Sequence, residues 1–367
     1  MAWLWLLVGV VVLTVGAEAL VRGASRLALA MNISPLVVGL TVVACGTSAP
    51  EFVVSVQSSL AGNPDLALGN VVGSNIFNVL LILGLSALIA PLVVDLQLVR
   101  FDVPLMILLS LLVAGLGYDG VVSRGDGLLL VAGLAAYLGW CVRQARKVAE
   151  PVARENHDTV AATEADPETK VSVTGKVFWQ QIALVLLGLV LLVVGARWFL
   201  GGAVDLARAL GVSELVIGLT LVAGGTSLPE LATSLLAALR GERDIAVGNV
   251  VGSNIFNILG VLGASATVST SGVGVSEAAR GFDIPVMAGV AVACLPIFLT
   301  GHRITRWEGA LFLAYYVAYV TQLILAATNP VAATTFRQAM LWYVLPLTAV
   351  TLLIGLSRHI RSRHSRP

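Results

Sequence analysis

Long stretches without a charged residue are the feature that most restricts what this chain can fold into. Several run for roughly 16 to 29 residues, and most could cross about 30 Å of hydrocarbon as a helix: 66–94, 127–142, 177–196 and 310–326. The 367 residues are 57% hydrophobic and only 12% charged, whereas about a quarter of the residues in soluble proteins are charged. The sequence therefore predicts an all-α, polytopic membrane protein.

Apolar length predicts eleven membrane-spanning helices, at 2–21, 33–60, 66–91, 101–118, 126–143, 176–200, 212–239, 245–269, 283–300, 307–327 and 338–357. The first is expected to be a retained span, since it lacks the positive start and the cleavage site of a secretory leader. Four regions follow from this division: a first membrane repeat at 1–143, a cytoplasmic linker at 144–175, a second membrane repeat at 176–327, and a C-terminal helix with a basic tail at 328–367.

Basic residues gather on one side of this arrangement. With the N-terminus outside, the cytoplasmic side carries most of them, among them Arg22, Arg26, Arg100, Arg143, Arg240, Arg243, Arg303, Arg306 and the tail 358–366. The opposite side has only scattered arginines, Arg124, Arg208, Arg280 and Arg337, with Arg197 at the outer end of the sixth span. Positive loops stay in the cytoplasm, so we expect a protein of the plasma (inner) membrane with its N-terminus outside and its C-terminus inside.

The chain repeats itself at a shift of 179 residues, and about 30 of 49 positions are identical between 36–84 and 215–263. Five predicted spans, an odd number, separate corresponding points, so the two copies cross the bilayer in opposite directions. This predicts an inverted repeat of two five-helix units, with an eleventh C-terminal helix appended. Equivalent residues of the copies are expected to face each other near the bilayer midplane.

Each copy carries one glutamate deep in an apolar span, Glu51 in GTSAPE and Glu230 in GTSLPE. An ionisable group at that depth is costly unless it is paired or faces a polar cavity. Hydroxyl groups lie on the same helical face, four and three residues before each glutamate: Thr47 and Ser48, and Thr226 and Ser227. The prolines of these motifs lack an N–H group, which leaves a backbone carbonyl of the preceding turn without its helical donor.

The decapeptide GNVVGSNIFN occurs once in each copy and adds neutral oxygen atoms, again at a spacing of four residues: Ser74 and Asn78, and Ser253 and Asn257. Hard cations such as Ca²⁺ take about six to eight oxygen ligands, and Na⁺ accepts similar donors. Two carboxylates neutralise one Ca²⁺ or two Na⁺, so the site favours exchange. For the other residues of the decapeptides the sequence leaves two roles open, a part in cation binding or a structural role in close helix packing and hydrogen bonding between helices: Gly69, Gly73, Gly248, Gly252, Asn70, Asn75, Asn249 and Asn254.

These four motifs resemble the α-repeats of the cation/calcium exchanger superfamily, in the bacterial and archaeal type of sodium/calcium antiporter. The resemblance covers both repeats and implies that Glu51 and Glu230 bind Ca²⁺ and Na⁺ alternately. It implies further ligands in Thr47, Ser48, Ser74, Thr226, Ser227, Ser253 and the carbonyls of Ala44 and Ala223. It also implies that the first and sixth spans slide against the rest. Sodium/calcium members often have Asp where this chain has Asn257, so the coupling ion and its number stay open.

The features together predict a secondary antiporter that exchanges Ca²⁺ for Na⁺. The alternative is proton-coupled antiport of Ca²⁺ or another divalent cation by the same glutamates, and K⁺ dependence and oligomeric state stay open. We expect no enzyme, because Ser48 and Ser227 have no neighbouring His or Lys, and no cofactor. A net charge of +1 gives no reason to expect nucleic acid as a partner, and three cysteines without paired spacing predict neither a zinc site nor a disulfide framework.

Overall fold

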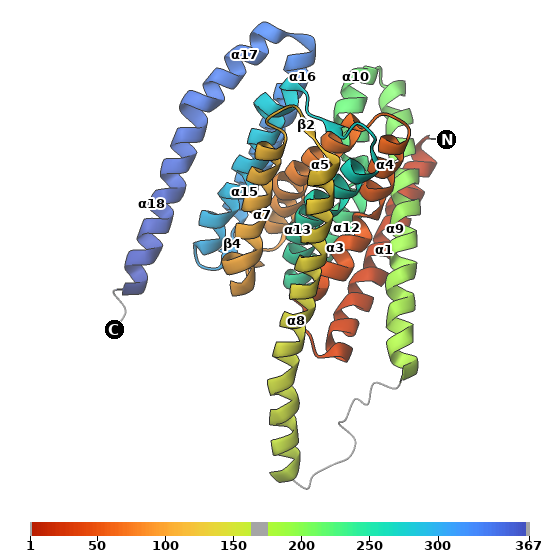
Figure 1. The fold of residues 1–367 in the computed structure, drawn as a ribbon, viewed down its shortest axis with the longest axis vertical. Helices are drawn as coiled ribbons and strands as arrows, with labels where there is room; N and C mark the ends of the chain where they lie inside the picture. Colours follow the sequence, from red (N-terminus) through yellow and green to blue (C-terminus); the bar gives the residue numbers. More distant parts are fainter. Residues whose placement is uncertain (1, 163–174, 365–367) are drawn as a thin grey trace.

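The computed structural model describes residues 2–162 and 175–364, most of them helical. Helix α1 (Ala2–Met31) lies beside α9 (Gly175–Ala209) along one flank of the bundle, and α8 (Arg124–Ala162) extends far beyond the bundle (Figure 1). The predicted linker is therefore helical as far as Ala162. Its residues 163–174 lie outside the described part of the chain.

The first repeat consists of α1 and four further spans, three of which change helix type along their length. The second and third spans comprise α2 (Pro35–Val38), η1 (Gly39–Val43), α3 (Ala44–Thr47), α4 (Ala49–Leu60), α5 (Asp65–Phe77), η2 (Asn78–Leu83) and α6 (Gly84–Ile89). Strand β1 (Leu92–Val93), η3 (Leu98–Asp102), α7 (Val103–Leu116), strand β2 (Val121–Val122) and α8 complete the repeat. The η segments are π-helical, with wider turns that are frequent at functional sites.

The second repeat has the same order, and its π-helical segments fall at the same places. After α9 come α10 (Glu214–Ile217), η5 (Gly218–Val222), α11 (Ala223–Gly225), α12 (Leu228–Arg240), α13 (Arg243–Phe256), η6 (Asn257–Leu262) and α14 (Gly263–Val268). They are followed by β3 (Val273–Gly274), η7 (Ala279–Asp283), α15 (Ile284–Leu299), β4 (Arg303–Ile304) and α16 (Arg306–Thr328). A further helix in three parts confirms the appended eleventh segment: α17 (Pro330–Ala339), η8 (Met340–Val344) and α18 (Leu345–His364).

Nine helices of the described residues are long and apolar enough to cross a membrane, and the pair Pro35–Thr47 and Ala49–Leu60, bent by 45°, makes a tenth span. The protein is therefore an integral membrane protein. The remaining predicted span, 212–239, is interrupted between Gly225 and Leu228, where α11 ends and α12 begins. Pro229 explains the interruption, because its ring cannot donate a helical hydrogen bond and obstructs the preceding turn.

Two short strand pairs connect the repeats symmetrically. β1 pairs antiparallel with β4, with Leu92 opposite Ile304, and β2 pairs antiparallel with β3, with Val121 opposite Gly274. β1 and β3 occupy the same place in their repeats, as do β2 and β4. Each pair thus joins one repeat to the other as a two-fold axis requires, which confirms the predicted inverted repeat.

Glycines allow α1 and α9 to approach closely. They recur every seven residues on both helices: Gly9, Gly16 and Gly23, and Gly188, Gly195 and Gly202. A Cβ atom at Gly188 would lie 2.6 Å from the backbone nitrogen of Leu20. One at Gly16 would lie 2.8 Å from the backbone nitrogen of Leu192. Since larger side chains do not fit along this seam, α1 and α9 form one closely packed pair.

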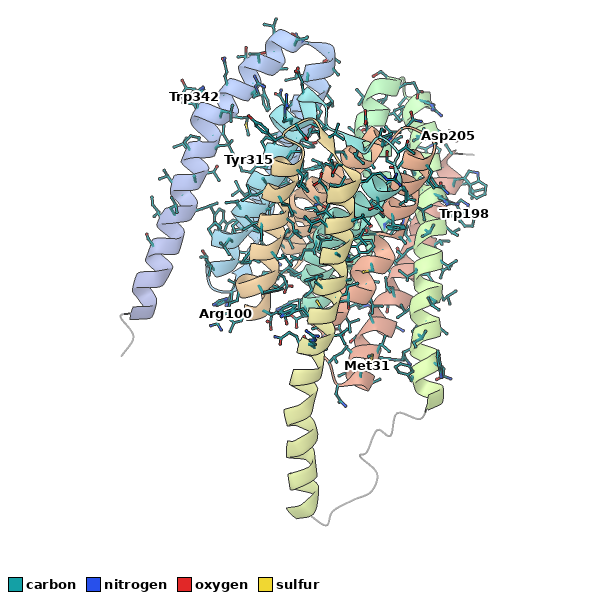
Figure 2. All side chains as sticks on the ribbon, in the orientation of Figure 1. Met31, Arg100, Trp198, Asp205, Tyr315 and Trp342 are labelled. Carbon is teal, nitrogen blue, oxygen red and sulfur yellow. The ribbon has the colours of Figure 1, made fainter. Side chains whose placement is uncertain are left out.

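Labelled side chains mark the two ends of the bundle in Figure 2. Met31 and Arg100 lie toward one end, and Asp205 lies toward the opposite end, where the N-terminus also lies (Figure 2). This arrangement of the ends agrees with the predicted sorting of spans. The orientation of the two ends relative to the cell is a prediction.

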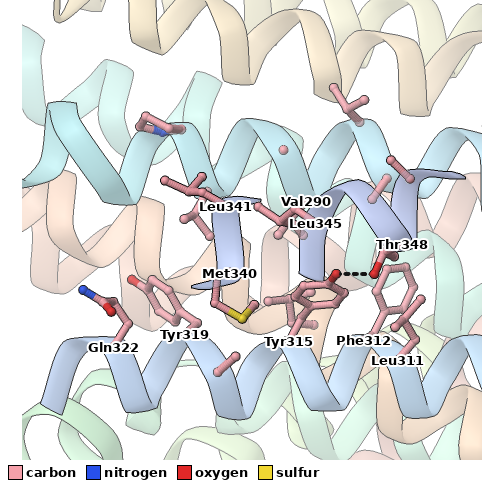
Figure 3. Close-up of a pocket in the computed structure, with 18 of the residues that line it drawn as sticks. Val290, Leu311, Phe312, Tyr315, Tyr319, Gln322, Met340, Leu341, Leu345 and Thr348 are labelled. Atoms are coloured by element: carbon pink, nitrogen blue, oxygen red, sulfur yellow. Dashed lines mark hydrogen bonds between the residues drawn. The ribbon is translucent and has the colours of Figure 1, made fainter. Parts of the chain in front are cut away.

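The C-terminal helix leans away from the bundle, and an apolar crevice of about 790 Å³ lies between it and helices α15 and α16 (Figures 1 and 3). Tyr315, Tyr319, Met340 and Leu345 are among its lining residues (Figure 3). The hydroxyl of Tyr315 lies 2.6 Å from Oγ1 of Thr348 and donates a hydrogen bond to it. The lining contains neither of the two central glutamates, so this crevice is not the predicted cation site.

Candidate cation-binding site

Each central glutamate lies in the first turn of a helix that begins at a break in its span, α4 or α12. The backbone leaves the helical conformation at Ser48 (φ −81°, ψ 8°) and at Ser227 (φ −87°, ψ 11°). A proline follows in the first turn of each new helix, where its missing N–H group is not needed. Glu51 and Glu230 lie in the same turns, near the helix end whose dipole favours negative charge. Both side chains are buried, with 1% of each residue exposed.

The two breaks meet at the centre of the bundle, where hydrogen bonds cross between the repeats. Ser48 Oγ donates to Glu230 Oε1 at 2.8 Å, and Ser227 Oγ donates to Glu51 Oε1 at 2.9 Å. Ser227 Oγ also lies 3.0 Å from Ser74 Oγ. Each glutamate is thus held by the serine that precedes the other glutamate by three residues. This exchange brings both carboxyl groups into one site, as the repeat predicted.

Threonine and asparagine side chains form a second layer of bonds between the repeats. Thr47 Oγ1 donates to Asn249 Oδ1 at 3.0 Å, and the amide of Asn249 donates to Ser234 Oγ at 2.9 Å. The equivalent bonds form in the other half of the site. Thr226 Oγ1 donates to Asn70 Oδ1 at 3.3 Å, and the amide of Asn70 donates to Ser55 Oγ at 2.9 Å. Asn70 and Asn249 therefore hydrogen-bond between helices, one of the two roles that the sequence left open. Sequence reasoning missed their serine partners, although each follows a central glutamate by four residues.

Four asparagines form a symmetric cluster across the two-fold axis. The amides of Asn75 and Asn254 donate to each other's backbone carbonyls, at 3.2 and 3.3 Å. Asn78 Nδ2 donates to Asn254 Oδ1, and Asn257 Nδ2 donates to Asn75 Oδ1, both at 3.0 Å. These bonds use the amide nitrogens of Asn78 and Asn257, and among residues 2–162 and 175–364 no donor reaches their Oδ1 atoms.

Several buried oxygen atoms of this region receive no hydrogen bond from the described part of the chain: Glu51 Oε2, Glu230 Oε2, Asn78 Oδ1, Asn257 Oδ1 and Ser253 Oγ. Leaving one buried polar atom unpaired costs about 1–3 kcal/mol. Two carboxylate oxygens, two amide oxygens and a hydroxyl are the donor types that a hard cation accepts. Bound Ca²⁺ or Na⁺ would therefore satisfy atoms that the protein itself leaves unsatisfied.

The two predicted carbonyl ligands lie in different surroundings. The carbonyl of Ala44 accepts hydrogen bonds from the N–H group of Ser48 at 3.1 Å and from Thr47 Oγ1 at 3.4 Å. The single proton of the Thr47 hydroxyl is shared with Asn249 Oδ1, which lies closer at 3.0 Å, so the Ser48 N–H group is the main donor to this carbonyl. Ala223 begins α11 and lines a cavity beside the site. The structure gathers the predicted side chains at the centre, and the carbonyl of Ala44 accepts the helical hydrogen bond from Ser48 there.

This cavity, of about 260 Å³, lies between α5 and the η5–α11 segment, and α16 and η7 complete its wall. A Cβ atom added to Gly69 or Gly73 of α5 would meet no atom within 4 Å. The equivalent face of α13 is closed, because a Cβ atom at Gly252 would lie 2.6 Å from the carbonyl oxygen of Leu40. Gly248 and Gly252 therefore serve helix packing, whereas Gly69 and Gly73 line an open space.

Sequence reasoning also missed a second symmetric pair of acids, Asp102, which is buried, and Asp283, which is half-buried. The hydroxyl of Tyr137 donates to Asp102 Oδ1 at 3.1 Å, and that of Tyr319 donates to Asp283 Oδ1 at 3.0 Å. The repeated tetrapeptides FDVP at 101–104 and FDIP at 282–285 are a signal that could have revealed them. Their shift is 181 residues rather than 179, so they do not align with the central repeat.

Comparisons with known proteins agree with these observations. The family described as "Sodium/calcium exchanger protein" matches residues 1–143 and 180–325. The sodium/calcium exchanger MaX1 of Methanosarcina acetivorans is 33% identical over 344 residues, which are 88% of this chain and 98% of that protein. The inner membrane protein YrbG of Escherichia coli K12 is 38% identical over 291 residues, 79% of this chain and 87% of that protein.

A solved structure, that of the sodium/calcium exchanger from Methanococcus jannaschii, superposes with a TM-score of 0.72 at 33% sequence identity. The match covers 87% of this chain and 97% of that one. The family match spans both repeats, and the relatives align with this chain over nearly their whole length. The chain therefore belongs to the sodium/calcium exchanger family of membrane cation antiporters.

Proposed function

We propose that this protein exchanges Ca²⁺ for Na⁺ across the membrane by alternating access. The observation that carries the proposal is the set of buried, unpaired oxygen atoms around Glu51 and Glu230. The two carboxylates neutralise either one Ca²⁺ or two Na⁺. Occupancy by one kind of ion then excludes the other, which is the physical basis of exchange.

Electrostatics couples this occupancy to movement. The two buried carboxylates repel each other, because like charges interact more strongly at the effective dielectric constant of a protein than in water. Burial adds the loss of their hydration. A cation cancels both effects, so the loaded site changes its access more readily than the empty, doubly charged site. The protein has two conformations, one open to each side of the membrane. A bound cation changes their relative populations only as far as it binds one conformation more tightly than the other.

The packing of the repeats supports alternating access. The η5 segment stands away from α5 beside the cavity, whereas the equivalent η1 segment packs tightly on α13. In an inverted repeat the second state is reached when the two halves exchange these arrangements. The α1–α9 pair packs against α12 and has its own closely packed seam. We place the sliding motion at the boundary between this pair and the rest of the bundle.

Flux measurements on purified protein in proteoliposomes test the coupling ion. Vesicles loaded with Na⁺ should accumulate ⁴⁵Ca²⁺ when diluted into Na⁺-free buffer, and a pH gradient without Na⁺ should drive no uptake. Uptake driven by the pH gradient alone would instead support the proton-coupled alternative, in which protons neutralise the glutamates. Addition of K⁺, Mg²⁺ or Sr²⁺ to the same assay defines K⁺ dependence and the range of divalent cargo.

We also propose that the N-terminus lies outside and the C-terminus inside the plasma (inner) membrane. The support is the unequal distribution of arginine between the two predicted faces. A green fluorescent protein fused to the C-terminus should fluoresce, and alkaline phosphatase fused there should be inactive. The reverse result would invert the orientation, and the cavity beside η5 would then open to the cytoplasm.

A further inference from the structure

The second pair of acids, Asp102 and Asp283, shows an asymmetry that the central glutamates do not. Each aspartate ends a π-helical segment, η3 or η7, and immediately precedes the helix that follows. Each also accepts a hydrogen bond from a tyrosine of the next long helix, Tyr137 of α8 or Tyr319 of α16. The two sites are thus equivalent in sequence order and in their tyrosine partner.

Asp102 is fully buried, and both oxygen atoms of its carboxylate accept hydrogen bonds. Its exposed fraction is 0%, and its Oδ2 atom accepts a hydrogen bond from Gln97 Nε2 at 3.2 Å in addition to the bond from Tyr137. The position equivalent to Gln97, at the same distance before Asp283, is Ala278. The second aspartate therefore has no such amide donor at that place.

Asp283 is half-buried and lines the 260 Å³ cavity beside the central site. The same cavity is lined by Gly73, which precedes Ser74 of the central site, and by Ala223 at the start of α11. Within the described residues no arginine or lysine forms an ion pair with Asp283. The guanidinium of Arg280, three residues earlier, donates instead to the carbonyl of Tyr118 at 3.1 Å.

Tyr319 holds this carboxylate at the cavity wall. Its ring stacks on Phe282 with centroids 5.8 Å apart, and it lines both the cavity and the apolar crevice shown in Figure 3. The stacked ring directs its hydroxyl to Oδ1 of Asp283. With Oδ1 engaged, Oδ2 is the oxygen left for a ligand in the cavity.

We propose that Asp283 is an encounter site for the transported cation on its way to Glu51 and Glu230, an inference that rests on the proposed antiport. A negative charge in a narrow cleft with low-dielectric walls raises the local concentration of cations and their association rate. One carboxylate with one available oxygen binds weakly, which lets the ion move on. Asp102 is the equivalent group for the opposite passage, and it is closed off in this state.

The decisive comparison is Asp283→Asn against Asp205→Asn in ⁴⁵Ca²⁺ uptake by right-side-out membrane vesicles, which present the N-terminal face. Asp205 lies at the same end but outside the cavity, so its variant removes the same charge from the wrong place (Figure 2). Asp283→Asn should raise the half-saturating Ca²⁺ concentration about tenfold. Its maximal rate and its equilibrium Ca²⁺ binding should stay within about twofold of wild type, because a group on the path changes association and dissociation alike.

The dependence on salt concentration distinguishes electrostatic attraction of cations by Asp283 from a structural role of this residue. In 0.5 M choline chloride the difference between Asp283→Asn and wild type should shrink to about twofold, since the Debye length falls below about 5 Å. Tyr319→Phe, which loses only the positioning hydroxyl, should show the same salt-sensitive change at about threefold. A salt-independent loss of maximal rate and Ca²⁺ binding in Asp283→Asn would overturn the proposal, as would wild-type behaviour at low Ca²⁺.

The opposite passage gives the symmetric arm of the test. In inverted vesicles Asp102→Asn should raise the half-saturating Ca²⁺ concentration and Asp283→Asn should not. If Asp102→Asn melts like wild type and transports normally from that face, the symmetric part of the proposal is wrong. Wild-type protein that shows no Na⁺-driven Ca²⁺ flux would contradict the proposed antiport itself. Normal flux with an unaffected Asp283→Asn would contradict only the encounter site.

Discussion

The two repeats share the decapeptide GNVVGSNIFN, yet its glycines have opposite surroundings in the two copies. In α13, Gly252 lies against the backbone of Leu40, and an added Cβ would come within 2.6 Å of its carbonyl oxygen. In α5, the equivalent Gly73 borders a cavity and would tolerate a Cβ in the present state. Identical sequences in different packing indicate that the motif serves two arrangements, one closed and one open.

The polar centre differs far less between the repeats. Ser48 and Ser227 hold the opposite glutamates at 2.8 and 2.9 Å, and the Asn75 and Asn254 amides exchange equivalent bonds. The asymmetry therefore lies in the access to the site more than in the site itself. Such a division is what alternating access requires, because the ion must be held similarly while its exit changes side.

The largest effect expected from this comparison is loss of antiport in Glu51→Gln and in Glu230→Gln alike. Each change removes one of the two negative charges that bind the cation. The free energy of Ca²⁺ binding should become less favourable by about 3–5 kcal/mol, and the flux should fall by a factor of about 100 or more. Na⁺-driven ⁴⁵Ca²⁺ uptake measures it, with exposed Glu277→Gln as the control. Residual transport in one variant alone would show that the repeats do not contribute equally.

Replacement of the serines that hold the glutamates, Ser48 and Ser227, should have the next largest effect and should differ between the repeats. A hydrogen bond to a charged group contributes about 1.5–3 kcal/mol, so Ser48→Ala should weaken Ca²⁺ binding about tenfold. Ser227→Ala should weaken it more, because Ser227 also contacts Ser74, whereas Ser253 Oγ has no hydrogen-bond partner in the described residues. Isothermal titration calorimetry of both variants tests the order. Equal losses would mean that the Ser74 contact has no energetic role.

The glycine pair separates stability from transport. Gly252→Ala forces α13 away from η1 and should destabilise the protein by about 1–3 kcal/mol, seen as a lower melting temperature in detergent. Gly73→Ala should melt like wild type or slightly higher, because Ala is the better helix former. Its flux should nevertheless fall several-fold, since α5 must close against η5 in the other state. Normal flux in Gly73→Ala would argue against this exchange of packing.

The smallest effect is expected at the loop between α9 and α10, where the repeats differ in sequence. Arg208 forms a two-point ion pair with Glu214, at 2.6 and 3.0 Å. The equivalent positions in the first repeat are Leu29 and Pro35. Exposed ion pairs contribute little and are screened by salt, so Glu214→Gln should change Ca²⁺ flux less than about twofold at low salt. A loss as large as that of the serine variants would assign this loop a role in gating.

Much of the site could be predicted from sequence because the repeat is nearly exact where the chemistry lies. The 179-residue shift pairs Glu51 with Glu230, and the spacing of four residues places Thr47 on the same face. The sequence predicted one continuous span at 212–239 and not the helix break at Ser227. Apolar length alone does not distinguish a straight membrane-spanning helix from a broken one. The pair Asp102 and Asp283 was not predicted, because the two residues are 181 positions apart and do not align at the 179-residue shift of the central repeat.

The open and closed faces could not be predicted from sequence at all. Gly73 and Gly252 occur in identical decapeptides, so no local signal distinguishes them. Their difference comes from how η1 and η5 pack, a property of the conformational state. Likewise, the hydrogen bond from the Ser48 N–H group to the Ala44 carbonyl depends on the backbone turn at Ser48, which composition and spacing do not specify.

Equilibrium binding of ⁴⁵Ca²⁺ to the purified protein tests the central claim most directly, with Na⁺ added in steps. The proposed antiport predicts one Ca²⁺ per chain, displaced competitively by Na⁺ and lost in both Glu51→Gln and Glu230→Gln. Binding that survives in either variant, or that Na⁺ cannot displace, would contradict a single cation site shared by the two repeats.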